Sequence, residues 1–198
     1  VLDTSNGCEN TDQVTVIQDL DVPEADAGSS MELNCLDTTV DLDGTNSETG
    51  PNIDYLWTTA DGQIDSGETS MTPTVSAPGT YELEVINNSN GCVNTATVVV
   101  TELPPVEAGI DAVTDALCAE DASGTATVSG SGGASNYTYD WSNGATGATA
   151  DGLLAGTYEV TVSDQIGCSD IVTVVVGEPD VILANATSTD ETSNDAND

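Results

Sequence analysis

The chain has 198 residues, 35 of them acidic, and it contains no lysine, arginine or histidine, so its formal net charge is −35. This composition excludes Ser-His-Asp triads, Schiff-base chemistry and imidazole metal ligands. Without cationic groups to neutralise phosphate, the chain is expected to bind no nucleic acid and no anionic membrane. No apolar run approaches the roughly 18 residues of a membrane span, so no membrane insertion is expected. Only carboxylates, thiols and hydroxyls remain for catalysis, and we expect a protein that is not an enzyme.

Internal repeats organise the sequence. The pattern of Ser5–Thr11 recurs at Ser89–Thr95, and Gly79–Val85 nearly recurs at Gly156–Val162. The repeats predict four parts: the C-terminal strands of a truncated module at 1–21, whole modules at 22–103 and 104–178, and the opening of a further module at 179–198.

Each whole module is expected to be all-β, because β-branched and aromatic residues alternate with polar ones. In chain order, the alternation predicts strands around Val40–Asp43, Ile53–Thr58, Tyr81–Val85, Tyr137–Trp141 and Tyr158–Val162. The Asp-Gly pair within Ala60–Gln63 predicts a hairpin turn. Short strands separated by frequent turns predict tandem Ig-like Greek-key β-sandwich modules arranged end to end.

The aromatic residues fit this fold. Trp57 and Trp141, the only tryptophans, are expected in the two cores. Tyr81 and Tyr158 each follow a Gly-Thr turn and open a strand, which predicts two tyrosine corners whose hydroxyls bond to nearby backbone. Sugar binding usually needs exposed aromatic rings, so inward-facing rings argue against it.

Two known repeat families resemble these modules. Residues 118–179 resemble the SprB repeat of giant surface adhesins of Bacteroidota, including the gliding-motility adhesin, through Tyr137–Thr146, Leu153–Tyr158, Gly167-Cys168 and Glu178-Pro179. Residues 22–103 resemble, more loosely, the PKD/Ig-like repeats of the same proteins, through Ala27-Gly28, Val40–Gly44, Pro78–Tyr81 and Gly91-Cys92. The resemblance implies a secreted or cell-surface protein of many modules, active in adhesion or gliding, with no catalytic residues.

The five cysteines occupy module-periodic positions and are expected to form disulfides in an oxidising extracellular setting. Two pairings are open. One joins Cys35 to Cys92 and Cys118 to Cys168 within each module, with Cys8 bonded upstream. The other joins Cys35 to Cys168 across modules, because the first inter-strand turn and the last hairpin of an Ig-type module lie at opposite poles, too far apart for one bond.

The acidic clusters suggest calcium as the one candidate cofactor. Oxygen ligands gather in the loop after the second strand, and other acids lie near the module junctions. The candidate ligands are Asp41, Asp43, Asn46, Glu48, Asp26, Glu107, Asp111, Glu178 and Asp180. The alternative is a solvated acidic surface with no bound ion. Mutual repulsion among the acids is also expected to raise carboxylate pKa values in the folded state.

Three functions are compared. The first is a structural stalk or fibre segment of a large extracellular adhesin, whose partners are neighbouring modules of the same chain and like chains in a fibre. The second is an adhesive module that binds extracellular polysaccharide. The third, a carboxylate glycosidase, would need two acids about 5–10 Å apart in a cleft, which modules of this size rarely build.

Overall fold

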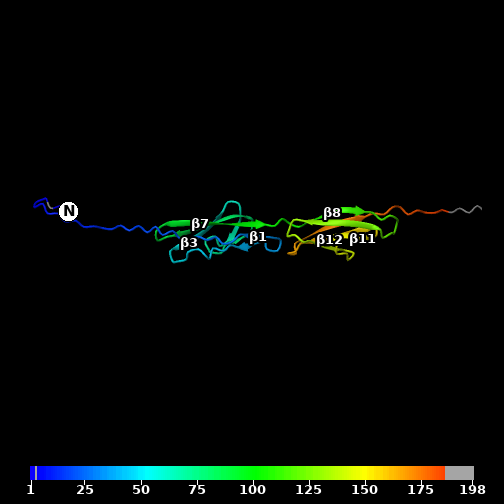
Figure 1. The fold of residues 1–198 in the computed structure, drawn as a ribbon, viewed down its shortest axis with the longest axis horizontal. Coiled ribbons are helices and arrows are strands. Elements are labelled where there is room, and N and C mark those ends of the chain that lie inside the picture. Colours follow the sequence, from blue (N-terminus) through cyan, green and yellow to red (C-terminus); the bar gives the residue numbers. More distant parts are fainter. Residues whose placement is uncertain (3, 186–198) are drawn as a thin grey trace, which may run out of the picture. The chain divides into compact units, whose positions relative to one another are not determined.

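The computed structural model describes residues 1–2 and 4–185. These residues form thirteen strands and no helix, so no helix in the described part of the chain could cross a membrane. The chain divides into two compact units, Val1–Glu102 and a second unit that begins at Leu103 (Figure 1). The sequence predicts a module junction between residues 103 and 104, and the observed boundary lies one residue earlier.

The first unit is a sandwich of two sheets, in the orders β1-β7-β6-β3 and β2-β5-β4. Its first strand lies parallel to its last, with Met31 opposite Val100, and every other pair is antiparallel. The strands are β1 (Met31–Leu33), β2 (Val40–Asp41), β3 (Ile53–Thr59), β4 (Ile64–Ser66), β5 (Thr74–Val75), β6 (Gly79–Asn87) and β7 (Cys92–Glu102).

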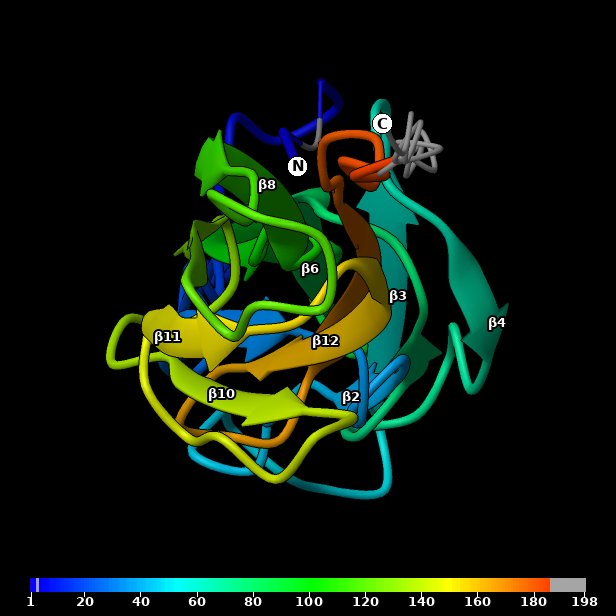
Figure 2. The same cartoon turned by 90° about the vertical axis from the view of Figure 1, so that its right-hand side faces the viewer.

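The second unit is also a sandwich of two sheets, in the orders β10-β12-β13 and β11-β9-β8, and all of its strand pairs are antiparallel. Figure 2 shows β10 and β12 side by side in one sheet. The strands are β8 (Glu107–Thr114), β9 (Gly124–Ser131), β10 (Thr138–Trp141), β11 (Thr149–Leu153), β12 (Gly156–Ser163) and β13 (Ser169–Val176). The predicted tandem Ig-like sandwich fold is therefore confirmed.

The predicted cores are also confirmed. Trp57 is 2% exposed and Trp141 is 4% exposed. Along β6, Tyr81, Leu83 and Val85 are buried, whereas Glu82 on the opposite face is exposed. Each such apolar side chain contributes about 1.5–3 kcal/mol when it leaves water. The two-residue alternation thus places the apolar side chains inside and the carboxylates outside.

Both tyrosine corners form as predicted. The Tyr81 hydroxyl donates to the carbonyl of Ala77 at 2.7 Å and accepts the backbone N–H of Gln63 at 2.9 Å. The Tyr158 hydroxyl donates to the carbonyl of Leu154 at 2.9 Å. In both units the acceptor carbonyl lies four residues before the tyrosine, so the same backbone bend is fixed in the same way.

The predicted hairpin at residues 60–63 is wrong. β3 and β4 belong to different sheets, so this bend carries the chain from one layer to the other. The bend is held against the start of β6, because the Asp61 carboxylate accepts the N–H of Thr80 at 2.9 Å. A Cβ at Gly62 would collide with the Tyr81 hydroxyl. The Asp-Gly pair is therefore selected by this close approach and not by a two-residue hairpin turn.

Residues 1–10 contain a small copy of the β6–β7 hairpin. The bridge Leu2↔Glu9 corresponds, at the repeat offset, to the pair Ile86↔Val93 of β6 and β7. Residues 11–22 form no strand and are exposed. The assignment of 1–21 to the last strands of another module stays a prediction, and most of the predicted opening at 179–198 lies outside the described residues.

Candidate functional site

The predicted calcium ligands of the first unit mostly bond to local groups. Asp41 accepts the Thr74 hydroxyl at 2.6 Å, and Asp43 accepts the Thr45 hydroxyl at 2.5 Å and the Thr45 N–H at 3.0 Å. Asp26 accepts the N–H of Gly28 at 2.8 Å. Nearby hydroxyl and backbone N–H groups thus bond to these carboxylates and fix the loop after β2 and the segment before β1.

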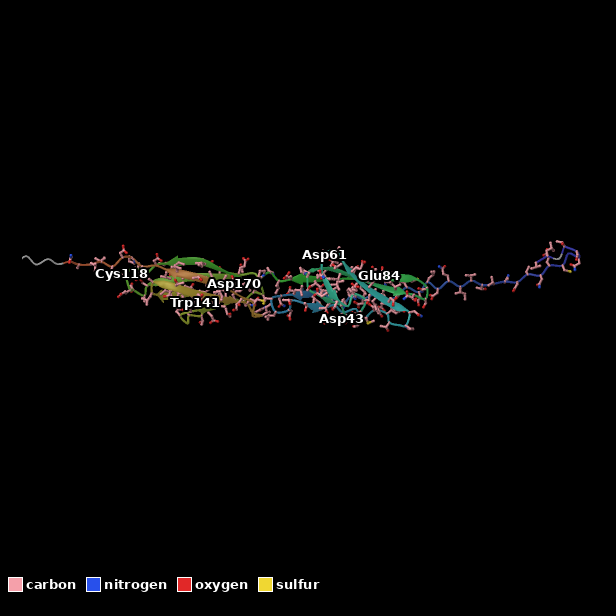
Figure 3. All side chains as sticks on the ribbon, turned by 180° about the vertical axis from the view of Figure 1, so that it is seen from behind. Asp43, Asp61, Glu84, Cys118, Trp141 and Asp170 are labelled. Carbon is pink, nitrogen blue, oxygen red and sulfur yellow. The ribbon has the colours of Figure 1, made fainter. Side chains whose placement is uncertain are left out.

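Two further candidates complete this loop region. The Glu48 carboxylate accepts the N–H of Glu24 at 3.3 Å, and the Glu48 carbonyl accepts the Tyr55 hydroxyl at 2.9 Å. Asn46 is exposed. Figure 3 shows the side chains of this unit, with Asp43, Asp61 and Glu84 labelled.

The other junction acids, Glu107, Asp111, Glu178 and Asp180, belong to the second unit, and two of them have clear partners. Asp111 on β8 accepts the Ser129 hydroxyl at 2.7 Å. Glu178 accepts the N–H of Glu120 at 2.7 Å. Glu107 and Asp180 are exposed. Among the residues that the structure describes, no three acidic or cysteine side chains come close enough together to hold a metal ion. Calcium binding therefore stays a prediction, without a preformed site in this part of the chain.

Three aspartates have lowered pKa values, so the expected rise is wrong for them. A hydroxyl bond and a backbone bond from Thr45 lower the pKa of Asp43. The N–H of Ala108, followed by that of Ile171, lowers the pKa of Asp170. With no basic side chain in the sequence, backbone N–H groups and hydroxyls are the donors that stabilise these carboxylates.

Asp164 is a carboxylate that the sequence analysis did not single out. It is 5% exposed and lies where β12 turns into β13. One carboxylate oxygen accepts the N–H groups of Ile166, Gly167 and Cys168 at 3.0, 2.9 and 2.9 Å, and the other accepts the N–H of Ala134 at 2.9 Å. Burial acts to raise the pKa of Asp164, but these four donors outweigh it and the pKa is lowered.

Asp164 therefore fixes the last hairpin of the second unit and ties it to the loop after β9. A Cβ at Gly133 would lie 2.5 Å from a carboxylate oxygen of Asp164, so this loop needs glycine at the contact. The sequence carries a weak signal for this arrangement, because Asp164 directly follows a strand and lies three residues before the glycine of Gly167-Cys168.

The cysteines divide into two classes by position. We call Cys35 and Cys118 the entry-turn cysteines, because each follows the first strand of its unit, and Cys8, Cys92 and Cys168 the hairpin cysteines. Cys35 and Cys168 are disulfide-bonded, whereas Cys8, Cys92 and Cys118 are free thiols. Pairing within each module is therefore wrong for this structure. Pairing of Cys35 with Cys168 agrees with the free thiols and stays a prediction.

The chain was compared with protein families. The model of the SprB repeat matches residues 110–146, which run from within β8 to just past β10. This match confirms the SprB resemblance of the second unit over that segment. No curated protein matches the chain.

Solved structures with similar folds include a PKD domain from the KIAA 1837 protein, which is 26% identical, with a TM-score of 0.33, over 43% of this chain and 92% of the domain. An I-band fragment of titin is 11% identical, with a TM-score of 0.48, over 81% of this chain and 66% of the fragment. Three N-terminal domains of the outer capsid protein Hoc of bacteriophage RB49 are 14% identical, with a TM-score of 0.46, over 79% of this chain and 59% of that one.

Proposed function

We propose that the chain is a structural repeat segment, a stalk or fibre, of a large extracellular adhesin or surface filament, and that it has no catalytic role. One observation carries this proposal: the aromatic and acidic side chains that could have formed a binding or catalytic site instead pack in the cores or hold turns. Both tryptophans and Tyr81 are buried in the cores. The best-bonded carboxylate, Asp164, holds a turn. The SprB match at residues 110–146 and the tandem modules support a repeat protein of the cell surface.

We also propose that residues 1–21 hold the last hairpin of another module of the same array. The turn supports this, because the N–H of Cys8 bonds to Asn6 at 2.9 Å and that of Cys92 bonds to Asn90 at 2.8 Å. The glycines between them, Gly7 and Gly91, have φ values of 74° and 76°. A hairpin with the same turn and the same register fits the same place in the fold.

The location can be tested on intact cells. An antibody raised against residues 22–178 should label cells that produce the parent protein, and proteinase K added outside should remove the label. Trypsin should leave the segment itself uncut, because it has no lysine or arginine. Labelling only after the cells are permeabilised would contradict a role at the cell surface.

The alternative function is binding of extracellular polysaccharide by the modules themselves. One observation favours it: Tyr139 is only half-buried, on β10, an edge strand of its sheet. Affinity electrophoresis in gels that contain extracellular polysaccharides separates the two functions. A stalk segment should migrate without retardation. Retardation that Tyr139→Ala removes and the neighbouring Thr138→Ala keeps would establish the alternative.

A further inference from the structure

Each of the two cysteine classes contains one disulfide-bonded cysteine and at least one free thiol. One entry-turn cysteine, Cys35, and one hairpin cysteine, Cys168, are disulfide-bonded. Their repeat equivalents, Cys118 and Cys92, are free thiols. Each whole module thus has one bonded and one free cysteine, and the two modules leave opposite classes free. A disulfide between the two cysteines of one module would leave neither of them as a free thiol.

The free hairpin thiol, Cys92, lies beside a turn like that of its bonded equivalent, Cys168. Cys92 begins β7 directly after the β6–β7 turn, as Cys168 lies directly before β13. Its N–H is held by the Asn90 side chain at 2.8 Å, as that of Cys168 is held by Asp164 at 2.9 Å. Both hairpin cysteines therefore have a fixed backbone.

Cys118 lies on an apolar surface. It is exposed, and it lines a hollow together with Leu117, Pro179, Val181 and Ile182. Leu117 is 76% exposed and Ile182 is 96% exposed. Beside the other entry-turn cysteine, Leu36 is 64% exposed. Exposed apolar groups gathered on one surface are typical of a surface that another protein surface covers.

We propose that Cys118 and Cys92 are half-cystines of disulfides between modules, in which an entry-turn cysteine of one module bonds to a hairpin cysteine of another. A second copy of this chain offers both classes. Cys118 of one copy would bond to Cys92 of the next, which makes a heterologous, head-to-tail contact that continues along a filament. This proposal rests on the proposed role as a segment of a repeat array.

The oxidation needs a disulfide oxidant, for which glutathione disulfide is suitable. The thiolate of Cys118 attacks one sulfur of glutathione disulfide, forms a mixed disulfide and releases one glutathione. The thiolate of Cys92 then attacks the Cys118 sulfur and releases the second glutathione. Two protein thiols are oxidised to one disulfide, and one glutathione disulfide is reduced to two glutathione molecules.

The test uses the whole chain with Cys8→Ser, which removes the third free thiol. After incubation with glutathione disulfide, linked species are separated without reductant and cut by an endoprotease specific for glutamate. Every cysteine lies in a different fragment, because glutamates separate them at Glu9, Glu24, Glu32, Glu48, Glu68, Glu82, Glu84, Glu102, Glu107, Glu120 and Glu159. We expect dimers and longer oligomers in which the Cys92–Cys118 crosslink predominates.

Matched variants make the result decisive. Cys118→Ser and Cys92→Ser, each combined with Cys8→Ser, should stay monomeric, while tryptophan fluorescence shows that both modules remain folded. Pairing at random among Cys92 and Cys118, a Cys92–Cys118 crosslink confined to monomers, or glutathione adducts alone would each overturn the proposal. None of these outcomes bears on cell-surface labelling, so the role as a surface segment is tested separately.

Discussion

The first strands of the two units are attached in different ways. In the first unit, β1 lies in a parallel ladder with the last strand, β7, and the pairs run from Met31↔Val100 to Leu33↔Glu102. In the second unit, β8 lies in the other sheet and pairs antiparallel with β9. The same type of sandwich thus has its first strand on opposite sheets.

In the second unit, side chains fasten β8 to the last strand instead of a ladder. Asp170 on β13 accepts the N–H of Ala108 at 2.9 Å, and Asp115 accepts the N–H of Gly177 at 2.7 Å. The N–H of Ala116 also bonds to the carbonyl of Gly177 at 2.9 Å. Carboxylates at both ends of β8 therefore close the edge of the sandwich, and Figure 3 labels one of them, Asp170.

The comparison teaches that the core determines the module and the edge can vary. A buried tryptophan, a tyrosine whose hydroxyl bonds to the carbonyl four residues earlier, and a last hairpin with its cysteine recur in both units, whereas the attachment of the first strand differs. Edge strands make few obligatory contacts, so either sheet can accept one if its N–H and C=O groups find partners.

The largest effect is expected from the shared core. Trp57→Ala and Trp141→Ala should each destabilise their own unit by about 3–5 kcal/mol, because each leaves a cavity. Each also removes an indole bond, to the carbonyls of Ser70 and Gly147 respectively. In either variant the remaining tryptophan reports only the other unit. Urea unfolding followed by fluorescence should show that transition unchanged, with Leu56→Ala as an exposed control. An equal shift in both units would contradict independent cores.

The next largest effect concerns the pH dependence of stability, which should differ between the last hairpins of the two units. Asn87 occupies the position of Asp164 but accepts the N–H of Ser89 at 2.9 Å, where Asp164 accepts four. The lowered pKa of Asp164 stabilises the folded state above the unfolded-state pKa, and this contribution is lost as pH falls through the folded pKa. The second unit should therefore lose stability in acid, and Asp164→Asn should lower its melting temperature at neutral pH and flatten this dependence.

Melting curves from pH 7 to about pH 2 test this prediction, since the carboxylates titrate within that range. In a Trp57→Phe background fluorescence follows the second unit through Trp141, and in a Trp141→Phe background it follows the first through Trp57. Asn87→Asp is the matched control, because it adds a carboxylate to a turn without the extra donors. An acid dependence of the second unit that Asp164→Asn leaves unaltered would contradict the assignment.

A smaller difference is expected between the tyrosine corners. Tyr81→Phe should cost about 1–3 kcal/mol, because it leaves the partly buried N–H of Gln63 and the carbonyl of Ala77 without the hydroxyl. Tyr158→Phe should cost about 0.5–1.5 kcal/mol, since Tyr158 is half-buried and loses the bond from its hydroxyl to the carbonyl of Leu154. Chemical denaturation of both variants measures the two costs, and equal costs would show that burial does not separate the corners.

The smallest effect concerns cations. Sodium should raise the melting temperature of both units by screening repulsion among the acids. Millimolar calcium at constant ionic strength should add about 1 kcal/mol if it binds at the affinity of extracellular modules. The first unit, with Asp41, Asp43 and Glu48, should gain more than the second. Coincident melting curves in chelator, sodium and calcium would show that calcium does not stabilise this protein, and would contradict calcium binding.

Local patterns predicted the cores and missed the edges. The alternation through Trp57 and Tyr81 depends on neighbours along one strand, so it can be read from the sequence. The layer change at Gly62 depends on the Tyr81 hydroxyl, 19 residues later in the printed sequence. The position of β8 depends on bonds with distant residues, from Ala108 to Asp170 and from Gly177 to Asp115, which no local pattern encodes. Asp164 bonds to three local N–H groups, but its bond to Ala134 joins residues 30 positions apart.

The outward carboxylates have a consequence for crowding. Glu82 and Asp54 lie on exposed positions of β6 and β3, and no basic side chain on a neighbouring copy could offset them. Copies tethered side by side would behave as a polyelectrolyte brush, whose spacing follows the screening length of about 30 Å at 0.01 M salt and about 8 Å at physiological ionic strength. Such a layer would swell in fresh water and compact in brine, without any change in the fold of its modules.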